Sequence, residues 1–258
     1  MLGWFSNVLE IEKASILKRV SAWLLDIIIV LIIATGFGWA LSSAFNLPEH
    51  VENLQASYSF YENKYSVTFD ITYDEYMALG EKALDYDKAY AELTNDLGAM
   101  KEYNLVLNYS LITATFAILI AVLVTEFVMP LIFKNGMTVG KKIFGIAVIR
   151  TNGVKASNIT IFVRALFGKY TIETMFPAYI ILMISFDILG SVGLIILALL
   201  AVLQLILVAA THNNYLIHDL LSDTVSVDFA SQLIFDSQEA LLEAKEKAHA
   251  ERVRREIY

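Results

Sequence analysis

The sequence predicts an all-α polytopic membrane protein. Hydrophobic residues make up 57% of the 258-residue chain and charged residues only 18%, whereas soluble domains usually carry about 25% charged residues. Several apolar runs are also long enough to cross a bilayer, which takes about 20 helical residues. The chain contains no cysteine, which excludes disulfides, thiolate metal sites and cysteine nucleophiles.

Two apolar segments predict the first two spans, and each contains one acid. The first covers about 20–45, where Asp26 is the single ionisable side chain, and the second covers about 105–133, where Glu126 is the single acid. A charge inside a membrane is costly, so we expect both acids to face protein or water and to have partners. A cleaved signal peptide is the alternative interpretation of the first segment. The charged lead, the length of the run and its internal acid disfavour it.

A third apolar segment, 174–217, has Asp187 as its single formal charge. At ~1.5 Å rise per residue, one helix of this length would be about twice as long as a bilayer is thick. We therefore expect a helical hairpin that turns near Asp187. It places the third span at about 172–186 and the fourth at about 189–211, which gives four transmembrane helices.

Basic residues set the predicted orientation. Residues 130–172 contain seven lysines and arginines and no acid, and a loop with that bias stays in the cytoplasm. Both termini are then cytoplasmic, with 1–19 as a short interfacial lead and 231–258 as a helical tail. The connection 46–104 lies on the extracytoplasmic side.

The 46–104 insert is predicted to be a soluble α/β segment. Residues 46–105 hold 12 acids and 4 lysines, which accounts for the whole net charge of −8. The pattern of 65–72 alternates as in a strand, 58–61 is expected to pair with it as a hairpin, and a helix follows from Asp74. Eight of the 13 tyrosines lie here. They either pack a small core or form a face that binds a ligand or partner.

Two short alternating segments predict a strand pair on the cytoplasmic side. Residues 146–150 read as a strand that enters a tight turn at 151–153, and 224–228 form the second strand. We expect the two to pair. Such a pair would tie the basic loop to the end of a membrane domain formed by 20–45 and 105–230.

The glycine-rich stretch from Gly136 to Lys142 looks like a phosphate loop but does not fit one. Three residues instead of four separate Gly136 from Gly140, and a lysine stands where Ser or Thr should bind Mg²⁺. We therefore reject nucleotide binding at this stretch.

Other catalytic or ligand sites are not indicated. His212, His218 and Asp219 could hold a metal, but no helical register brings the three together, so a pair of interfacial histidines is the preferred interpretation. No Ser/His/Asp set or pair of carboxylates for hydrolysis stands out. We expect no enzymatic activity, no cofactor, no metal and no nucleic-acid partner.

Membrane depth predicts one polar cluster. By helix rise, Asp26 and Glu126 both lie ~8–10 Å inside the inner leaflet, Gln204 of the fourth span lies at a similar level, and Arg19 and Asp219 lie near the interface. Two functions remain open for this cluster. Asp26 with Glu126 binds a proton or small cation, or the set forms structural ion pairs that fix the order of the helices.

Three stretches together resemble the RDD family of prokaryotic integral membrane proteins. They are the Arg19–Asp26 segment, the loop with Gly136, Gly140, Lys141 and Gly145, and the segment 218–224. The family is named for one arginine and two aspartates, which match Arg19, Asp26 and Asp219 of this sequence. The resemblance covers about 15–46 and 105–230 and does not extend to the insert.

The resemblance implies a multi-pass protein of the bacterial plasma membrane. Transport is the function usually suggested for the family, and exchange of a monovalent cation for a proton has been proposed for some members. A non-enzymatic structural, regulatory or partner-binding role is the alternative for this chain. The protein is expected to contact the lipid bilayer. Its protein partner could be a second copy of the chain or another membrane protein.

Overall fold

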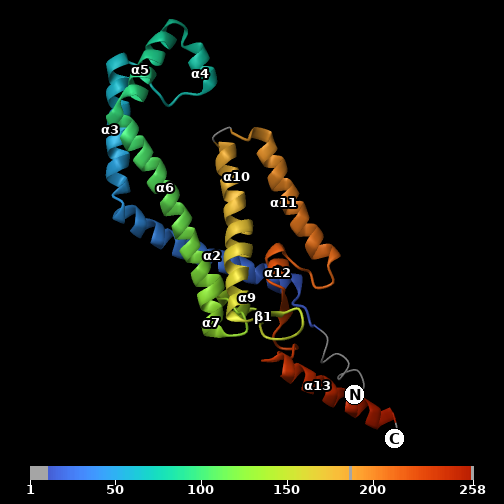
Figure 1. Ribbon diagram of the computed structural model, residues 1–258. Coiled ribbons are helices and arrows are strands. Elements are labelled where there is room, and N and C mark those ends of the chain that lie inside the picture. Colours follow the sequence, from blue (N-terminus) through green and yellow to red (C-terminus); the bar gives the residue numbers. More distant parts are fainter. Residues whose placement is uncertain (1–10, 186–187, 257–258) are drawn as a thin grey trace. The chain divides into compact units, whose positions relative to one another are not determined.

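The computed structural model describes residues 11–185 and 188–256, and most of these are helical (Figure 1). Within them, three helical runs are long and apolar enough to cross a membrane: α2 (Ile16–Ala44), the run Leu97–Phe133 and α11 (Gly190–Ala210). The run Leu97–Phe133 consists of α6 (Leu97–Leu123), the π-helical segment η2 (Val124–Val128) and α7 (Met129–Phe133). These observations confirm a helical membrane protein.

The chain divides into two compact units. We call Met1–Ala34 with Ile118–Tyr258 the core unit, and Thr35–Ala117 the insert unit. Each is described by itself.

The insert unit is built from helices, and the predicted hairpin is wrong. It contains α3 (Leu47–Tyr65), α4 (Tyr73–Ala78), η1 (Gly80–Lys82) and α5 (Ala83–Asn95), followed by the start of α6. The predicted strand partner 58–61 lies inside α3, and 66–72 form an irregular connection. None of the residues described in this unit is in a strand.

Aromatic packing explains why the alternating pattern did not make a strand. Tyr58, Tyr61 and Tyr65 recur at helical spacing and pack with Leu93 and the Phe69 side chain in a small core. α3 ends where Ser66 adopts a left-handed backbone conformation with φ 53°. Phe69 then belongs to a connection that folds back on the helix, with its ring 5.9 Å from that of Tyr58.

The core unit contains the predicted strand pair. β1 (Ile146–Arg150) and β2 (Thr224–Asp228) are antiparallel, with Ile146 opposite Asp228 and Arg150 opposite Thr224. Both faces of the pair are buried, because the apolar side chains of both strands are at most 1% exposed. The chain before α2 continues this pairing, since the Ala14 N–H donates to the Ser226 carbonyl at 3.1 Å. Residues 1–10 of the predicted interfacial lead lie outside the described residues.

One continuous helical run, 158–185, forms the centre of the core unit. It consists of α9 (Asn158–Val163), the π-helical segment η3 (Arg164–Met175) and α10 (Phe176–Ser185). α10 packs side by side with α11 (Figure 1). The predicted third span, 172–186, falls in this run and stays a prediction. Asp187, where the predicted hairpin turns, lies outside the described residues.

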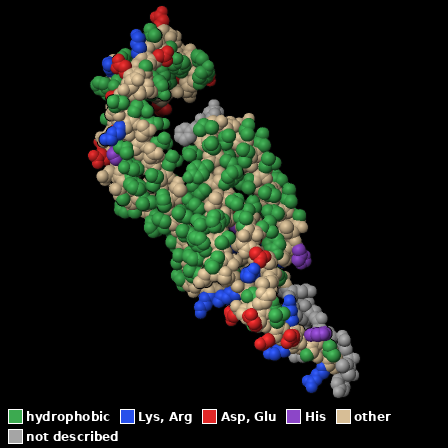
Figure 2. Space-filling model, in the orientation of Figure 1, with side chains coloured by type: hydrophobic (Ala, Val, Ile, Leu, Met, Phe, Trp, Pro, Cys, Tyr) green, Lys and Arg blue, Asp and Glu red, His purple; other side chains and the backbone are tan. Residues whose placement is uncertain are grey.

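Short helices and a terminal helix complete the core unit. α8 (Val139–Ile143) follows the glycine-rich loop, and α12 (Ile217–Leu221) packs on η3. α13 (Gln238–Glu256) is the predicted tail helix, and the Ser237 hydroxyl oxygen accepts from the Ala240 N–H at 3.2 Å at its start. Hydrophobic side chains cover the surface over α10 and α11, whereas charged side chains gather around α13 (Figure 2).

Gly140 sets how closely α8 approaches α2. A Cβ added at this glycine would lie 2.2 Å from the Ala22 carbonyl oxygen and 3.0 Å from Asp26 Cγ. The contact is with backbone, which cannot move aside as a flexible side chain can. We expect Gly140→Ala to lower the free energy of unfolding by about 1–3 kcal/mol, the range for overpacked sites. Unfolding in detergent, followed by loss of helical circular dichroism, measures it.

Gly36→Ala is the matched control, since Gly36 is in α2 and nothing lies within 4 Å of its added Cβ. Its stability should equal or exceed that of the wild type, because alanine favours a helix over glycine. If Gly140→Ala unfolds at the same midpoint as the wild type, α8 does not approach α2 as closely as described.

Candidate functional site

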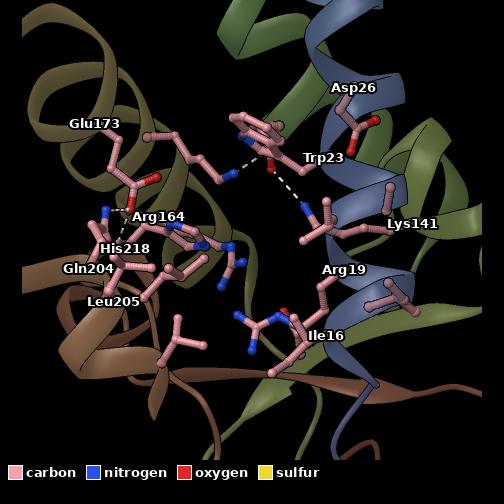
Figure 3. Close-up of a pocket in the computed structure, with 18 residues that line it drawn as sticks. Ile16, Arg19, Trp23, Asp26, Lys141, Arg164, Glu173, Gln204, Leu205 and His218 are labelled. Atoms are coloured by element: carbon pink, nitrogen blue, oxygen red, sulfur yellow. Dashed lines mark hydrogen bonds and ion pairs between the residues drawn. The ribbon is translucent and has the colours of Figure 1, made fainter. Parts of the chain in front are cut away.

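A partly open cavity of about 520 Å³ lies in the core unit (Figure 3). Side chains from α2, α8, α11 and α12 line it, together with residues of η2 and η3. Many ionisable groups of the core unit meet here. The charged lining residues are Arg19, Asp26, Glu126, Lys141, Arg164, Lys169 and Glu173.

Two π-helical segments bring the charged side chains to the cavity. Lys169 lies five positions after Arg164. In an α-helix this spacing would put the two side chains roughly 140° apart around the axis. The wider turn of a π-helix, with its i→i+5 hydrogen bonds, puts them near one face. In η3 this winding is visible at Phe176, whose N–H donates to the Thr171 carbonyl. Glu126 lies in the second such segment, η2.

Glu126 is held by two lysines. Lys141 Nζ donates to Glu126 Oε2 at 2.9 Å, and Lys169 Nζ lies 3.4 Å from Glu126 Oε1. The three side chains are between 7% and 14% exposed, so the charges are largely removed from water. A buried carboxylate with two cations is compensated, and η2, α8 and η3 are joined through it.

Asp219 is held by two arginines. Arg19 Nη2 donates to Asp219 Oδ2 at 3.1 Å, and Arg164 Nη1 donates to Oδ1. The Leu216 N–H donates to Oδ2 at 3.0 Å. Burial by itself raises the pKa of the Asp219 carboxyl, but the charges of Arg164, His218 and Arg19 outweigh it and hold that pKa well below its usual range. Asp219 is therefore ionised at neutral pH and links α2, η3 and α12.

Glu173 and His218 form a third pair. His218 Nδ1 lies 2.7 Å from Glu173 Oε1, and Gln204 Nε2 donates to the same oxygen at 3.0 Å. Burial first, and then the charge of Arg164, lower the pKa of His218 to about 4. The ring is therefore neutral at neutral pH. Because a carboxylate oxygen can only accept, Nδ1 carries the proton of the neutral ring.

Asp26 differs from the other acids of the cavity. Thr138 Oγ1 donates to Asp26 Oδ2 at 2.5 Å, and the Gly140 N–H donates to Oδ1 at 2.8 Å. Its side chain is buried, and no lysine or arginine in the described ranges forms an ion pair with it. It is thus a buried carboxylate satisfied by neutral donors.

The structure places all five predicted site residues at one location. Arg19, Asp26, Glu126 and Gln204 line the cavity, and Asp219 binds Arg19 at its edge. Within the set, Arg19 and Asp219 form an ion pair, whereas Asp26 and Glu126 have their partners outside it. Gln204 bonds to Glu173 and to the Ile217 N–H, and not to Asp26 or Glu126.

The residues of the loop motif have distinct structural roles. Gly136 has φ 64°, and an added Cβ would lie 2.7 Å from Val148 Cβ. Gly145 has φ 67°, a conformation that side chains disfavour. Gly140 permits the approach to α2, and Lys141 carries the positive charge to Glu126. Of these four residues, Lys141 lines the cavity.

Sequence reasoning missed four charged or polar residues of the site. The sequence indicates Arg164 and Lys169 only as parts of the basic loop 130–172, and Thr138 only as part of the glycine-rich stretch. It predicts no role for Glu173. His218 was expected to be interfacial, and it is 2% exposed against η3. A usable signal existed in the Arg164, Lys169 and Glu173 series, which lies in a helical run next to an apolar segment.

Comparison with known protein families decides the membership of the chain. Residues 13–223 match the RDD family, and this range includes the Arg19, Asp26 and Asp219 positions that give the family its name. The chain belongs to the RDD family. No curated protein and no solved structure matches this RDD protein in the comparisons made with them. The arrangement of its charged residues therefore has to be read from the contacts above.

Neutralising Asp219 should strongly destabilise the RDD protein. Asp219→Asn leaves Arg164 and Arg19 without their shared carboxylate in a site where Asp219 is 1% exposed. Breaking a buried pair costs roughly 3–5 kcal/mol. Asp223→Asn makes the same change at an exposed pair with Arg150 and should cost less than about 1 kcal/mol. Unfolding in mixed micelles measures both, and equal losses would contradict the anchoring role of Asp219.

Burial of neutral His218 should make stability fall as pH falls. The unfolded chain binds a proton to this histidine near pH 6.5, whereas the folded chain does so only near pH 4. Between these values the unfolded state binds more protons, so stability rises with pH there, by roughly 3 kcal/mol over the window. Free energies of unfolding at several pH values measure this slope.

The control for this pH dependence removes one histidine at a time. Glu173 and Asp219 face His218 and can also make the free energy of unfolding depend on pH. The contribution of His218 is therefore the pH slope of the wild type minus the pH slope of His218→Gln. His212→Gln, at an exposed residue, should keep the wild-type slope. A wild-type slope that persists in His218→Gln would contradict the assignment.

Proposed function

We propose that this RDD protein transports protons across the bacterial plasma membrane, with a small monovalent cation as the coupled ion, and that Asp26 binds the proton. The proposal involves no enzymatic step and no cofactor. The observation that carries it is the buried Asp26 carboxylate, which has neutral hydrogen-bond donors and no ion pair among the described residues. Ionisable groups inside membrane segments mark ion or proton pathways by default.

The hydrogen bonds of Asp26 are compatible with both of its protonation states. When Asp26 is ionised, the Thr138 hydroxyl donates to Oδ2. When it is protonated, the carboxyl can donate to Thr138 Oγ1 instead, because a hydroxyl is both donor and acceptor. The Gly140 N–H keeps an acceptor, Oδ1, in either state. A proton can therefore bind or leave without exposing an unsatisfied group.

The charges of the cavity favour a proton over a metal cation at Asp26. Four cations line the cavity, namely Arg19, Lys141, Arg164 and Lys169. Small hard cations need several oxygen ligands, whereas one of the two oxygens of Asp26 faces the Gly140 N–H. We therefore assign proton binding to Asp26 and leave the coupled ion to experiment.

The proposed topology has four spans and cytoplasmic termini. The run 158–185 contains residues 172–185 of the predicted third span, packs through α10 against α11, and would be that span. The loop 130–172 carries seven basic residues and no acid, which supports a cytoplasmic position for this side. Asp26 would then be reached from the cytoplasmic side through the open cavity.

A purely structural role is the alternative that the ion pairs favour. Glu126 and Asp219 each join elements far apart in the sequence and are satisfied without any ligand. In that case Asp26 only positions the loop at Thr138 and Gly140. The two functions differ in one measurable respect, which is net proton movement.

Purified protein in liposomes tests the proposal. A gradient of Na⁺ or K⁺ is imposed, and the internal pH is followed with a trapped dye. Wild-type protein should change the internal pH, and Asp26→Asn should reduce the rate at least about tenfold, because an amide cannot take up the proton. Asp223→Asn, an exposed acid of the same unit, is the matched control and should keep the wild-type rate.

Insertion and folding have to be equal for the comparison. Protein content per liposome and circular dichroism establish this for each variant. Equal proton flux in wild type and Asp26→Asn would remove the transport proposal. Absence of flux in the wild type with both ions would favour the structural role.

A further inference from the structure

We infer that the basic part of the cavity binds the phosphate of an anionic phospholipid whose acyl chains lie against α2 and α11. The inference goes beyond the proposed transport of protons, since it concerns other residues of the cavity. Three observations carry it: an unsatisfied buried donor, a cluster of four cations in the lining, and an apolar rim.

The unsatisfied donor is Arg164 Nε. The Arg164 side chain is 3% exposed, and its Nη1 donates to Asp219 and to Thr224 Oγ1. Its Nε is buried and has no hydrogen-bond partner among the described residues. Most buried donors in proteins are paired, and one without a partner often marks the place of an absent molecule. Arg164 is one of the residues that line the cavity, so the unsatisfied guanidinium belongs to the cavity wall.

Four cations gather in the lining. Arg19 and Lys169 join Arg164 at the cavity, and Figure 3 shows Arg19 and Arg164 extending into the same space from α2 and from the opposite helical run. Lys141 is the fourth, and Asp219, at the edge, pairs with both arginines. Guanidinium groups match phosphate oxygens with several donors, so phosphate is the chemistry that the two arginines suit.

The rim of the same cavity is apolar and exposed. Trp23 of α2 is 51% exposed, and Leu205 of α11 is 69% exposed. Both helices are candidate spans, so these side chains would face acyl chains in a bilayer. Tryptophan is also enriched where lipid headgroups meet hydrocarbon. A ligand with a phosphate at one end and apolar chains at the other fits this arrangement better than a free phosphate ion does.

The phosphate site and Asp26 are separate along α2. Asp26 lies seven positions after Arg19, which corresponds to ~10 Å of helix rise. Arg19 is in the first turn of α2, where the phosphate layer is expected, and Asp26 lies deeper. Failure of proton transport in liposomes would therefore leave the lipid site standing, and the reverse also holds.

Lipid retention measured by native mass spectrometry tests the inference. Detergent-purified full-length protein is incubated with phosphatidylglycerol, which is anionic, or with phosphatidylcholine, which has no net charge. Both lipids carry a phosphate, but the cations of the lining repel the choline ammonium of phosphatidylcholine. Wild-type protein should therefore retain phosphatidylglycerol at least about tenfold more than phosphatidylcholine.

Two variants and one matched control assign the site. Lys169→Gln should reduce retention of phosphatidylglycerol about tenfold, since Glu126 keeps Lys141 as its partner and the fold survives. Lys142→Gln removes the same charge from an exposed lysine outside the lining and should retain lipid as the wild type does. Arg164→Lys keeps the charge but removes Nε, so a reduction in this variant as well assigns binding to the guanidinium.

Three outcomes would overturn the lipid assignment. The first is equal retention of the two lipids by the wild type. The second is an equal loss in Lys169→Gln and Lys142→Gln, which would mean a general charge effect. The third is inorganic phosphate raising the unfolding midpoint of the wild type as much as phosphatidylglycerol does, which would assign the site to the free ion. Circular dichroism of each variant separates loss of binding from loss of folding.

Discussion

The contact on which the core unit depends is the Asp219 carboxylate between Arg19 and Arg164. It connects the first turn of α2 with η3 and α12, segments that are about 50 to 200 residues apart along the chain. At this burial neither the acid nor the arginines could be left without a partner, because an uncompensated buried charge is strongly unfavourable. The other polar contacts follow from this anchor, since it fixes the distance between α2 and the helical run 158–185.

The π-helical segments are the second constraint. A π-helix is rare and occurs mostly as single turns, frequently at functional sites. Here η2 carries Glu126, and the twelve-residue η3 carries Arg164, Lys169 and Glu173. The wider winding turns side chains toward the cavity that an α-helix would place on different faces. The charged lining is therefore a property of the backbone as much as of the residue types.

The cavity combines two kinds of polar environment. Asp26 is satisfied by a hydroxyl and a backbone N–H, whereas Arg164 Nε has no hydrogen-bond partner among the described residues. Glu126 is compensated by two lysines, and Glu173 is hydrogen-bonded to His218 and Gln204. The proposed proton site and the proposed phosphate site thus share one cavity, and ion pairs connect the elements of its wall.

The sequence by itself determined the membrane character, the strand pair of 146–150 and 224–228, and the RDD residues Arg19, Asp26 and Asp219, because apolar length, alternation and motif spacing are local properties. It was wrong about a hairpin at 58–72, since aromatic residues over so short a stretch fit a strand and a helix alike. Only the tertiary structure decided that Arg164, Lys169, Glu173 and His218 belong to the site. Their meeting depends on π-helical winding and on contacts between distant segments, and neither leaves a periodic trace in the chain.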